Sequence, residues 1–117
     1  MMNVVNAVDS ELKLNDDNFN RIFSSNKCTS VRLGNKDIRP GLAHIRNEKT
    51  GQLLLVNIWY VNHCLLSDLE INDARLDGFS TMEDLKAELR RCYSRSISDR
   101  EVITQVHFDV VKHSEVA

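Results

Sequence analysis

Apolar residues spaced three and four positions apart predict a short helix near the beginning of the chain. Phe19, Ile22 and Phe23 share one face of a helix at this spacing. Asn15 precedes them and suits the N-cap, where its side chain can accept a hydrogen bond from the first helical turn. The two aspartates that follow Asn15 favour the positive end of the helix dipole. We therefore expect an amphipathic helix that begins at Asn15.

Two further helices are predicted in the second half of the chain. Ser67 with Glu70, and Ser80 with Glu83, match the reciprocal capping pattern in which a hydroxyl precedes a glutamate by three positions. The second of these helices has the clearer apolar stripe and should end near Tyr93. The positions of this stripe are Met82, Leu85, Leu89 and Cys92 or Tyr93.

Extended segments alternate with these helices. Strands are predicted for Cys28–Leu33, from Leu42 to the turn at residues 47–51, for Leu53–Val61 and for Glu101–Val111. The segment Leu53–Val61 has apolar residues on both faces, so we expect a central strand that is covered on each side and is the best-buried part of the chain. Residues 1–14 have little periodicity and form either a lead-in segment or a short edge strand.

The order of these elements predicts the class of fold. A helix, several strands, more helices and a last strand are typical of an α+β domain with a mostly antiparallel sheet. At this size the sheet can close into a small barrel, which removes its exposed edges. A chain of 117 residues suits one domain. We expect a lead-in at residues 1–14, the domain at residues 15–111 and a tail at residues 112–117.

The composition is that of an ordinary globular chain. Hydrophobic residues make up 42% and charged residues 27%, which excludes wholesale disorder, and the net charge of −2 gives no general attraction to nucleic acid. The longest apolar-rich run, Leu53–Val61, is too short to cross a membrane, and the first residues do not resemble a secretion signal. We expect a cytoplasmic protein without membrane contact and without an obligate protein partner.

The cysteines and histidines do not indicate a metal site. Cys28, Cys64 and Cys92 are widely separated and odd in number, and the four histidines show no paired ligand spacing. Cys28 has no histidine nearby in the sequence to activate it, so a structural thiol is favoured over a nucleophile. We therefore expect neither a metal nor another cofactor.

Two polar stretches contain the candidate chemistry. In the first, Lys27 stands at the mouth of a strand that carries Thr29, Ser30 and Arg32. In the second, Asp77 precedes a glycine. We expect these side chains to converge on one polar pocket. Taken singly, each has a plainer interpretation as a solvated loop lysine, a strand hydroxyl or a turn aspartate.

These stretches resemble a known family. Residues 26–34, Asn-Lys-Cys-Thr-Ser-Val-Arg-Leu-Gly, are similar to the Gly-x-Lys-Thr-x-Thr-Ile-Arg type of segment found in ASCH domains, which belong to the PUA-like β-barrel superfamily. Residues 73–79, the amphipathic helix after them and a last strand at residues 102–110 are similar to the remainder of that pattern. The resemblance spans residues 15–111 and implies a PUA-like small β-barrel with two or three flanking helices.

The resemblance also implies an activity. Small bacterial members of the family include acetylcytidine amidohydrolases, which use a lysine, a threonine and a glutamate. The resemblance places these roles on Lys27, Ser30 and Asp77, where serine keeps the hydroxyl and aspartate is one methylene shorter than glutamate. Ser30 would attack the acyl carbon, Lys27 would accept its proton and Asp77 would handle the leaving amine. Arg32 and Thr29 would contact the substrate.

Two alternatives involve RNA, because the family also contains RNA-binding modules and members linked to ribonuclease activity. In an RNA-binding module the pocket would receive a base, and in a ribonuclease Lys27 and Arg32 would stabilise charge at phosphorus. The basic residues predicted to contact phosphates are Lys36, Arg39, Arg90, Arg91 and Arg95. Arg90, Arg91 and Arg95 also complement the negative end of the last helix, which is the plainer and slightly favoured interpretation. Trp59 or Tyr60 is either a core aromatic or a stacking face for a base.

Overall fold

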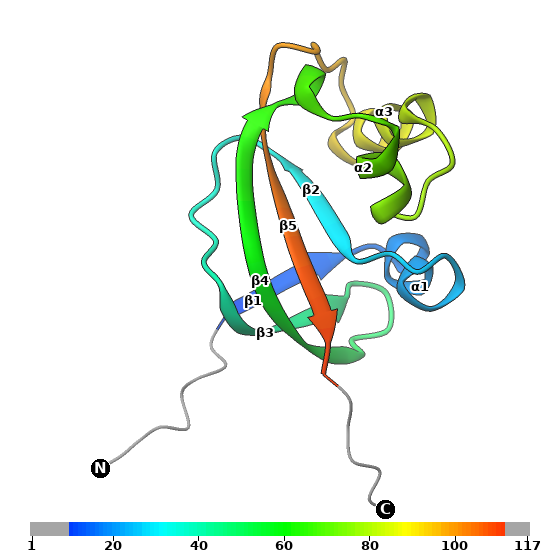
Figure 1. The fold of residues 1–117 in the computed structure, drawn as a ribbon. Coiled ribbons are helices and arrows are strands. Elements are labelled where there is room, and N and C mark those ends of the chain that lie inside the picture. The colour runs from blue at the N-terminus through cyan, green and yellow to red at the C-terminus, as the bar shows by residue number, and fades with distance from the viewer. Residues whose placement is uncertain (1–9, 112–117) are drawn as a thin grey trace, which may run out of the picture.

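The computed structural model describes residues 10–111, which form a single curled sheet with helices along one side (Figure 1). Its elements in chain order are β1 (Ser10–Leu14), α1 (Asp16–Ser24), β2 (Thr29–Leu33), β3 (Gly41–Asn47), β4 (Leu53–Leu65), the 3-10 helix η2 (Leu66–Asp68), α2 (Ile71–Leu76), α3 (Met82–Tyr93) and β5 (Val102–Val110). Of the segment expected to be a lead-in or an edge strand, Ser10–Leu14 is a strand and residues 1–9 lie outside the described part. The predicted tail at residues 112–117 also lies outside it.

The five strands form one mixed sheet in the order β1-β3-β4-β5-β2. The pair β1 and β3 is parallel, and the other three pairs are antiparallel. The sheet curls into a half-barrel, so that its edge strands β1 and β2 approach one another (Figure 1). Arg32 connects these edges, because its Nη2 donates to the Lys13 carbonyl oxygen at 3.0 Å. The prediction of an α+β fold with a mostly antiparallel, barrel-like sheet is confirmed.

Helix α1 begins as predicted. The Oδ1 of Asn15 accepts a hydrogen bond from the Asn18 backbone N–H at 2.8 Å, which satisfies one of the free donors of the first turn. Phe19 and Ile22 are buried on the face toward the sheet, whereas Phe23 is 58% exposed. The predicted stripe is therefore correct for its first two members and wrong for the third.

The predicted starts of the two later helices need correction. Helix α3 ends at Tyr93 as expected, but its N-cap is Thr81 rather than Ser80, because the Thr81 hydroxyl accepts from the Asp84 N–H. The Ser67 segment opens with the 3-10 turn η2, and α2 begins only after Glu70. The starts of η2 and α2 are each determined by an aspartate three positions after the N-cap residue, which is Leu65 for η2 and Glu70 for α2. Asp68 accepts from the backbone N–H of Leu65, and Asp73 accepts from that of Glu70.

The prediction that residues 53–61 are covered on both faces is wrong. Strand β4 is central in the sheet, but within the predicted segment only Val56 and Ile58 are buried. Trp59 and Tyr60 are 55% and 48% exposed, and the strand register shifts between Ile58 and Tyr60. These two rings and His107 pack against one another on the outer face of the sheet. The core interpretation of Trp59 is therefore wrong as well.

Two apolar clusters hold the described domain together. One fills the concave side of the sheet and includes Phe19, Ile45, Ile58 and Phe108. The other lies between the opposite end of the sheet and helices α2 and α3, and its members are Val31, Leu33, Leu66, Leu69, Ala74, Phe79, Leu85, Leu89 and Ile103. Strand β2 contributes Val31 and Leu33 to this second cluster. Ser30 and Arg32 alternate with them and therefore lie on the other face of β2. The polar face of β2 is thereby directed toward the space beside α1.

Candidate functional site

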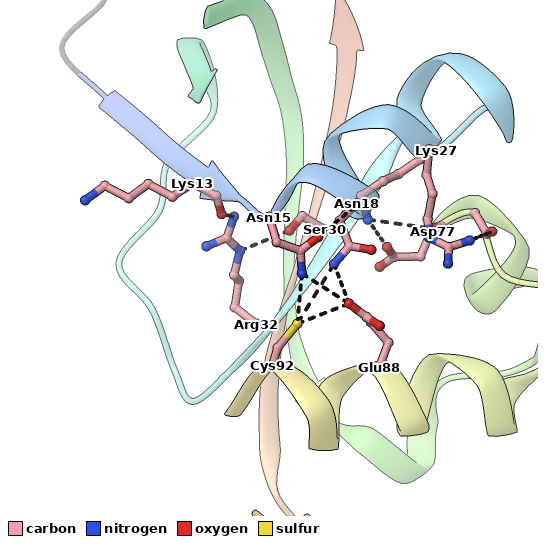
Figure 2. Close-up of polar contacts among 11 residues, drawn as sticks. Lys13, Asn15, Asn18, Lys27, Ser30, Arg32, Asp77, Glu88 and Cys92 are labelled. Carbon is pink, nitrogen blue, oxygen red and sulfur yellow. Dashed lines mark hydrogen bonds and ion pairs between the residues drawn. The ribbon is translucent and has the colours of Figure 1, made fainter. Parts of the chain in front are cut away.

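A cavity of about 320 Å³ lies between the end of β1, helix α1, strand β2 and helix α3. Its polar lining includes Lys27, Ser30, Arg32 and Asp77, so the structure brings together four of the five side chains predicted to form the pocket. Figure 2 shows these side chains with further polar groups from α1 and α3. The charged groups are largely removed from solvent, because Lys27 is 4% exposed and Asp77 is 2% exposed. Four polar side chains from different parts of the sequence therefore share one cavity.

The backbone around Lys27 aims its side chain into the cavity. Asn26 adopts the left-handed conformation with φ of 55°, which turns the chain after α1. The Lys27 N–H then donates to the Arg21 carbonyl, and the Cys28 N–H donates to the Leu76 carbonyl at 2.7 Å. The lysine is therefore held between α1 and the end of α2.

Asp77 closes helix α2 and enters the same cavity. Gly78 follows with φ of +92°, and an added Cβ there would lie 3.3 Å from Cβ of Arg21 and 3.4 Å from Cβ of Lys27. Only glycine combines this backbone conformation with such close neighbours at no steric cost. The glycine beside the carboxylate is thus required for the approach of Asp77 to Lys27.

Lys27 and Asp77 form a buried ion pair in which Nζ contacts Oδ1. Burial raises the pKa of the Asp77 carboxyl, and Lys27, the Val31 backbone and Arg32 act in the opposite direction. The second carboxylate oxygen, Oδ2, is buried and has no hydrogen-bond partner among residues 10–111. Oδ2 is therefore the oxygen of the pair that lacks a hydrogen bond of normal geometry within the described residues.

Ser30 and Arg32 stand two residues apart on the same face of β2. Arg32 Nε donates to Ser30 Oγ at 3.0 Å, so the serine hydrogen is left to donate elsewhere. Burial lowers the pKa of Arg32, yet a guanidinium starts so high that it stays cationic near neutral pH. A serine hydroxyl is thus held beside a partly buried positive charge.

Of the other predicted contact residues, only Arg91 lines the cavity. Thr29 is fully buried on the opposite face of β2 and does not line the cavity. Arg91 lines the cavity edge and pairs with Glu88, while Arg95 pairs with Glu101 at 2.7 Å. Arg90 is an exposed residue of α3. Lys36 and Arg39 belong to the segment between β2 and β3, where Arg39 pairs with Asp37.

The sequence interpretation missed several polar residues of the cavity, among them Asn18 and Glu88. Asn18 Nδ2 donates to Glu88 Oε2 at 2.8 Å, which joins helix α1 to helix α3 (Figure 2). A signal was present, because Asn18 precedes Ile22 by four positions and is therefore a polar residue on the apolar face of its helix. Glu88 likewise lies next to the Leu85 and Leu89 stripe of α3.

Hydrogen bonds keep Glu88 ionised. Desolvation raises the pKa of Glu88, but hydrogen bonds from Arg91, Cys92, Asn15 and Asn18 outweigh it and lower the value to about 2. Burial and the same carboxylate raise the pKa of the Cys92 thiol to about 11, so the thiol remains a donor to Glu88. The Cys92 thiol therefore has a structural role as a hydrogen-bond donor to Glu88.

Within residues 10–111 no group of three or more histidine, cysteine, aspartate or glutamate side chains is arranged to hold a metal ion. No helix in the same range is long and apolar enough to span a membrane.

Comparison with known proteins identifies the fold. No family model matches the sequence, and no curated protein matches it. The structure is similar to an ASCH domain from Lactobacillus crispatus JV V101, with a TM-score of 0.70 and 17% identity over 91% of this chain and 82% of that chain. It is also similar to a DUF984 protein from Enterococcus faecalis V583, with a TM-score of 0.62 and 12% identity over 89% and 80% of the two chains. The expected ASCH-like fold is thereby confirmed.

Proposed function

We propose that the cavity binds a nucleoside and that the chain hydrolyses the N-acyl group of a cytidine-like nucleoside. The observation that carries this proposal is the buried Lys27–Asp77 pair in the same cavity as Ser30 and Arg32. A nucleophile, a base and a group that stabilises developing negative charge are what amide hydrolysis needs. The ASCH-like fold agrees with this reaction, because the family includes acetylcytidine amidohydrolases.

The size and charge of the site favour a nucleoside over RNA. A cavity of about 320 Å³ is at the small end of ligand sites and suits a single nucleoside. Three of the basic residues that would contact RNA phosphates, Arg39, Arg91 and Arg95, are already paired with carboxylates. Phosphate binding would have to displace these carboxylates.

Ser30 is the proposed nucleophile. Because Arg32 Nε donates to Oγ, the guanidinium stabilises the alkoxide that forms as the serine proton leaves. The proposed proton acceptor is Lys27, which can act as a base once its Nζ has passed a proton to the Asp77 carboxylate that it contacts.

The reaction then proceeds through an acyl-serine. Ser30 Oγ forms a bond to the acyl carbon, and the carbon–nitrogen bond to the base breaks. The leaving amine takes the proton that Lys27 accepted from Ser30. Water then attacks the ester, which releases the carboxylic acid and restores the hydroxyl. Further N–H groups of Arg32 stabilise the charge on the acyl oxygen in both steps.

Chromatographic turnover of acetylcytidine tests this proposal. Wild type should release cytidine, and Lys27→Ala and Ser30→Ala should each lose at least about a hundredfold in rate. The matched controls, Lys49→Ala and Ser24→Ala, alter exposed residues and should keep the activity.

A parallel incubation with labelled RNA separates the alternatives. Fragmentation of the RNA that disappears in Lys27→Ala would favour a ribonuclease. Intact RNA that is retained, with no nucleoside turnover, would favour a binding module. Either result without acetylcytidine hydrolysis contradicts the proposed function.

A further inference from the structure

Two buried acceptors without partners line the cavity. Asn18 Oδ1 and Asp77 Oδ2 have no hydrogen-bond partner among residues 10–111, although the two residues are only 8% and 2% exposed. Buried polar atoms are nearly always hydrogen bonded, so each orphan of this kind requires an explanation. Because both residues line one cavity, a ligand that donates two N–H groups would satisfy them together.

The orientation of the Asn18 amide is determined by Glu88. Asn18 Nδ2 donates to Glu88 Oε2 at 2.8 Å, and a carboxylate can only accept. If the amide were turned by half a rotation, its oxygen would face the carboxylate oxygen and the hydrogen bond would be lost. Since the pKa of Glu88 is about 2, the carboxylate stays ionised near neutral pH. The amide oxygen must therefore face away from Glu88.

Glu88 itself is held from several sides. Arg91 donates to it twice, from Nε at 3.0 Å and from Nη2 at 2.6 Å. Cys92 donates its S–H at 3.2 Å, and Asn15 Nδ2 approaches at 3.3 Å. Figure 2 shows the Asn18 amide in the space between Glu88 and the Lys27–Asp77 pair. The network thus directs one neutral acceptor toward the interior of the site.

We infer that Asn18 and Asp77 together accept the exocyclic amino group of a pyrimidine base, with Asn18 as a specificity-determining residue and Glu88 as the residue that positions its amide. This inference rests on the proposed function and assigns the part of the cavity that recognises the base. A cytosine-type base presents N–H donors at this position. A uracil-type base presents a carbonyl oxygen there, which would face two acceptor oxygens and be rejected.

The same pair of acceptors favours departure of the leaving group. The acylated nitrogen carries one N–H, and it gains a second hydrogen when the carbon–nitrogen bond breaks. Asn18 Oδ1 and Asp77 Oδ2 can therefore both be satisfied only as the free amine forms. Interactions that strengthen along the reaction raise its rate.

Binding of the two unmodified nucleosides tests the inference without requiring turnover. Nuclear magnetic resonance titrations with cytidine and with uridine measure weak affinities and report at the same time whether each variant is folded. Wild type should bind cytidine at least about tenfold more tightly than uridine. In Asn18→Ala and in Glu88→Gln this preference should fall to less than about threefold, since the second variant lets the Asn18 amide turn. The controls Asn20→Ala and Glu83→Gln, which alter exposed residues of the same helices, should keep the wild-type preference.

The ratio of the two affinities separates recognition from a structural role. Partial loss of folding lowers the apparent affinities for cytidine and uridine by the same factor and leaves their ratio unchanged. A wild type without preference, or one whose preference survives in both variants, would overturn the inference even if acetylcytidine is hydrolysed. A preference that depends on Asn18 in a protein that hydrolyses nothing would support the inference and contradict only the hydrolase. Absence of binding to either nucleoside would overturn both.

Discussion

At the scale of single residues, the buried pair of Lys27 and Asp77 carries a large desolvation cost. Both charges are almost fully removed from water, and attraction between them recovers the desolvation cost only in part. Apolar side chains of similar size would fill the same space without that cost. The pair lines the same cavity as Ser30 and Arg32, and the proposed function uses all four side chains.

Double substitution of this pair should separate stability from function. Lys27→Met and Asp77→Leu should each destabilise the fold by about 3 kcal/mol, because each leaves a buried charged group without its partner. The double variant should unfold within about 1 kcal/mol of wild type, since neither charge remains. Urea unfolding at pH 7 measures all three values.

The partly exposed ion pair of Lys86 and Asp99 provides the control for the effect of burial on these stability changes. Its members are partly solvated, so the corresponding single variants should change the free energy of unfolding by less than about 1 kcal/mol. If the costs at Lys27 and Asp77 simply add in the double variant, the desolvation argument is incorrect. Loss of nucleoside binding in the stable double variant would show that the pair contributes to binding rather than to stability.

At the scale of elements, helices α1 and α3 meet through polar groups at the cavity. Glu88 of α3 accepts hydrogen bonds from Asn15 and Asn18 of α1, while the apolar stripe of each helix packs toward the sheet or toward α2. The N-cap residue Asn15 therefore has two roles, because its oxygen starts α1 and its nitrogen contacts Glu88. A cap residue identified from the sequence is thus also part of the candidate site.

The contact between these helices should be sensitive to acid. The pKa of Glu88 lies below its ordinary value of 4.5, at about 2, so the folded state binds this proton less readily than the unfolded state does. Its stabilising contribution is present above pH 4.5 and is lost as the pH falls toward 2. Glu88→Gln should cost about 2 kcal/mol at pH 7, and this cost should shrink as the pH is lowered toward 3.

Urea unfolding of wild type and Glu88→Gln at several pH values measures this difference directly. Other carboxylates with a lowered pKa, such as Glu11 and Glu101, contribute equally to the pH dependence of both proteins. Their contributions therefore cancel in the difference between the two free energies of unfolding. Glu83→Gln, an exposed change in the same helix, should show no such convergence. A cost that stays constant from pH 7 to pH 3 would mean that the charge of Glu88 is not what joins the helices.

At the scale of the whole molecule, charge is distributed in local pairs. The net charge is −2, and three of the arginines and lysines proposed for phosphate contact are bound to neighbouring carboxylates. The exposed Trp59 and Tyr60 lie on the outer face of β4, and neither lines the cavity. Within residues 10–111, the exposed aromatic rings are therefore not part of the cavity wall.

Salt should consequently have little effect on recognition. Affinity for cytidine should change less than about twofold between 50 mM and 500 mM salt, because no phosphate is contacted. An RNA oligonucleotide in the same buffers should bind no more tightly than the nucleoside at 150 mM salt. A steep loss of RNA affinity with added salt, from a tight starting value, would instead indicate the phosphate contacts of an RNA-binding module.

The sequence by itself determined the local elements and one strand of the site. Side chains a few positions apart decide helix stripes, turns and strand alternation, so α1, the end of α3 and the shared face of Ser30 and Arg32 were predictable. The ASCH-like fold followed from the order of these elements and from the resemblance of residues 26–34 to the family pattern. The helix starts were harder to predict than the stripes, because Asp68 and Asp73 compete with nearby hydroxyls for the same backbone N–H donors.

Only the tertiary structure decided which distant side chains share the cavity and which face of β4 stays open. Lys27 meets Asp77 fifty positions away, and Asn18 meets Glu88 seventy positions away. No periodicity relates residues so far apart, because their approach depends on how the sheet curls and on where α1 and α3 pack against it. Burial of β4 likewise depends on what covers the sheet rather than on the strand's own apolar residues, which is why Trp59 is exposed in an otherwise apolar segment.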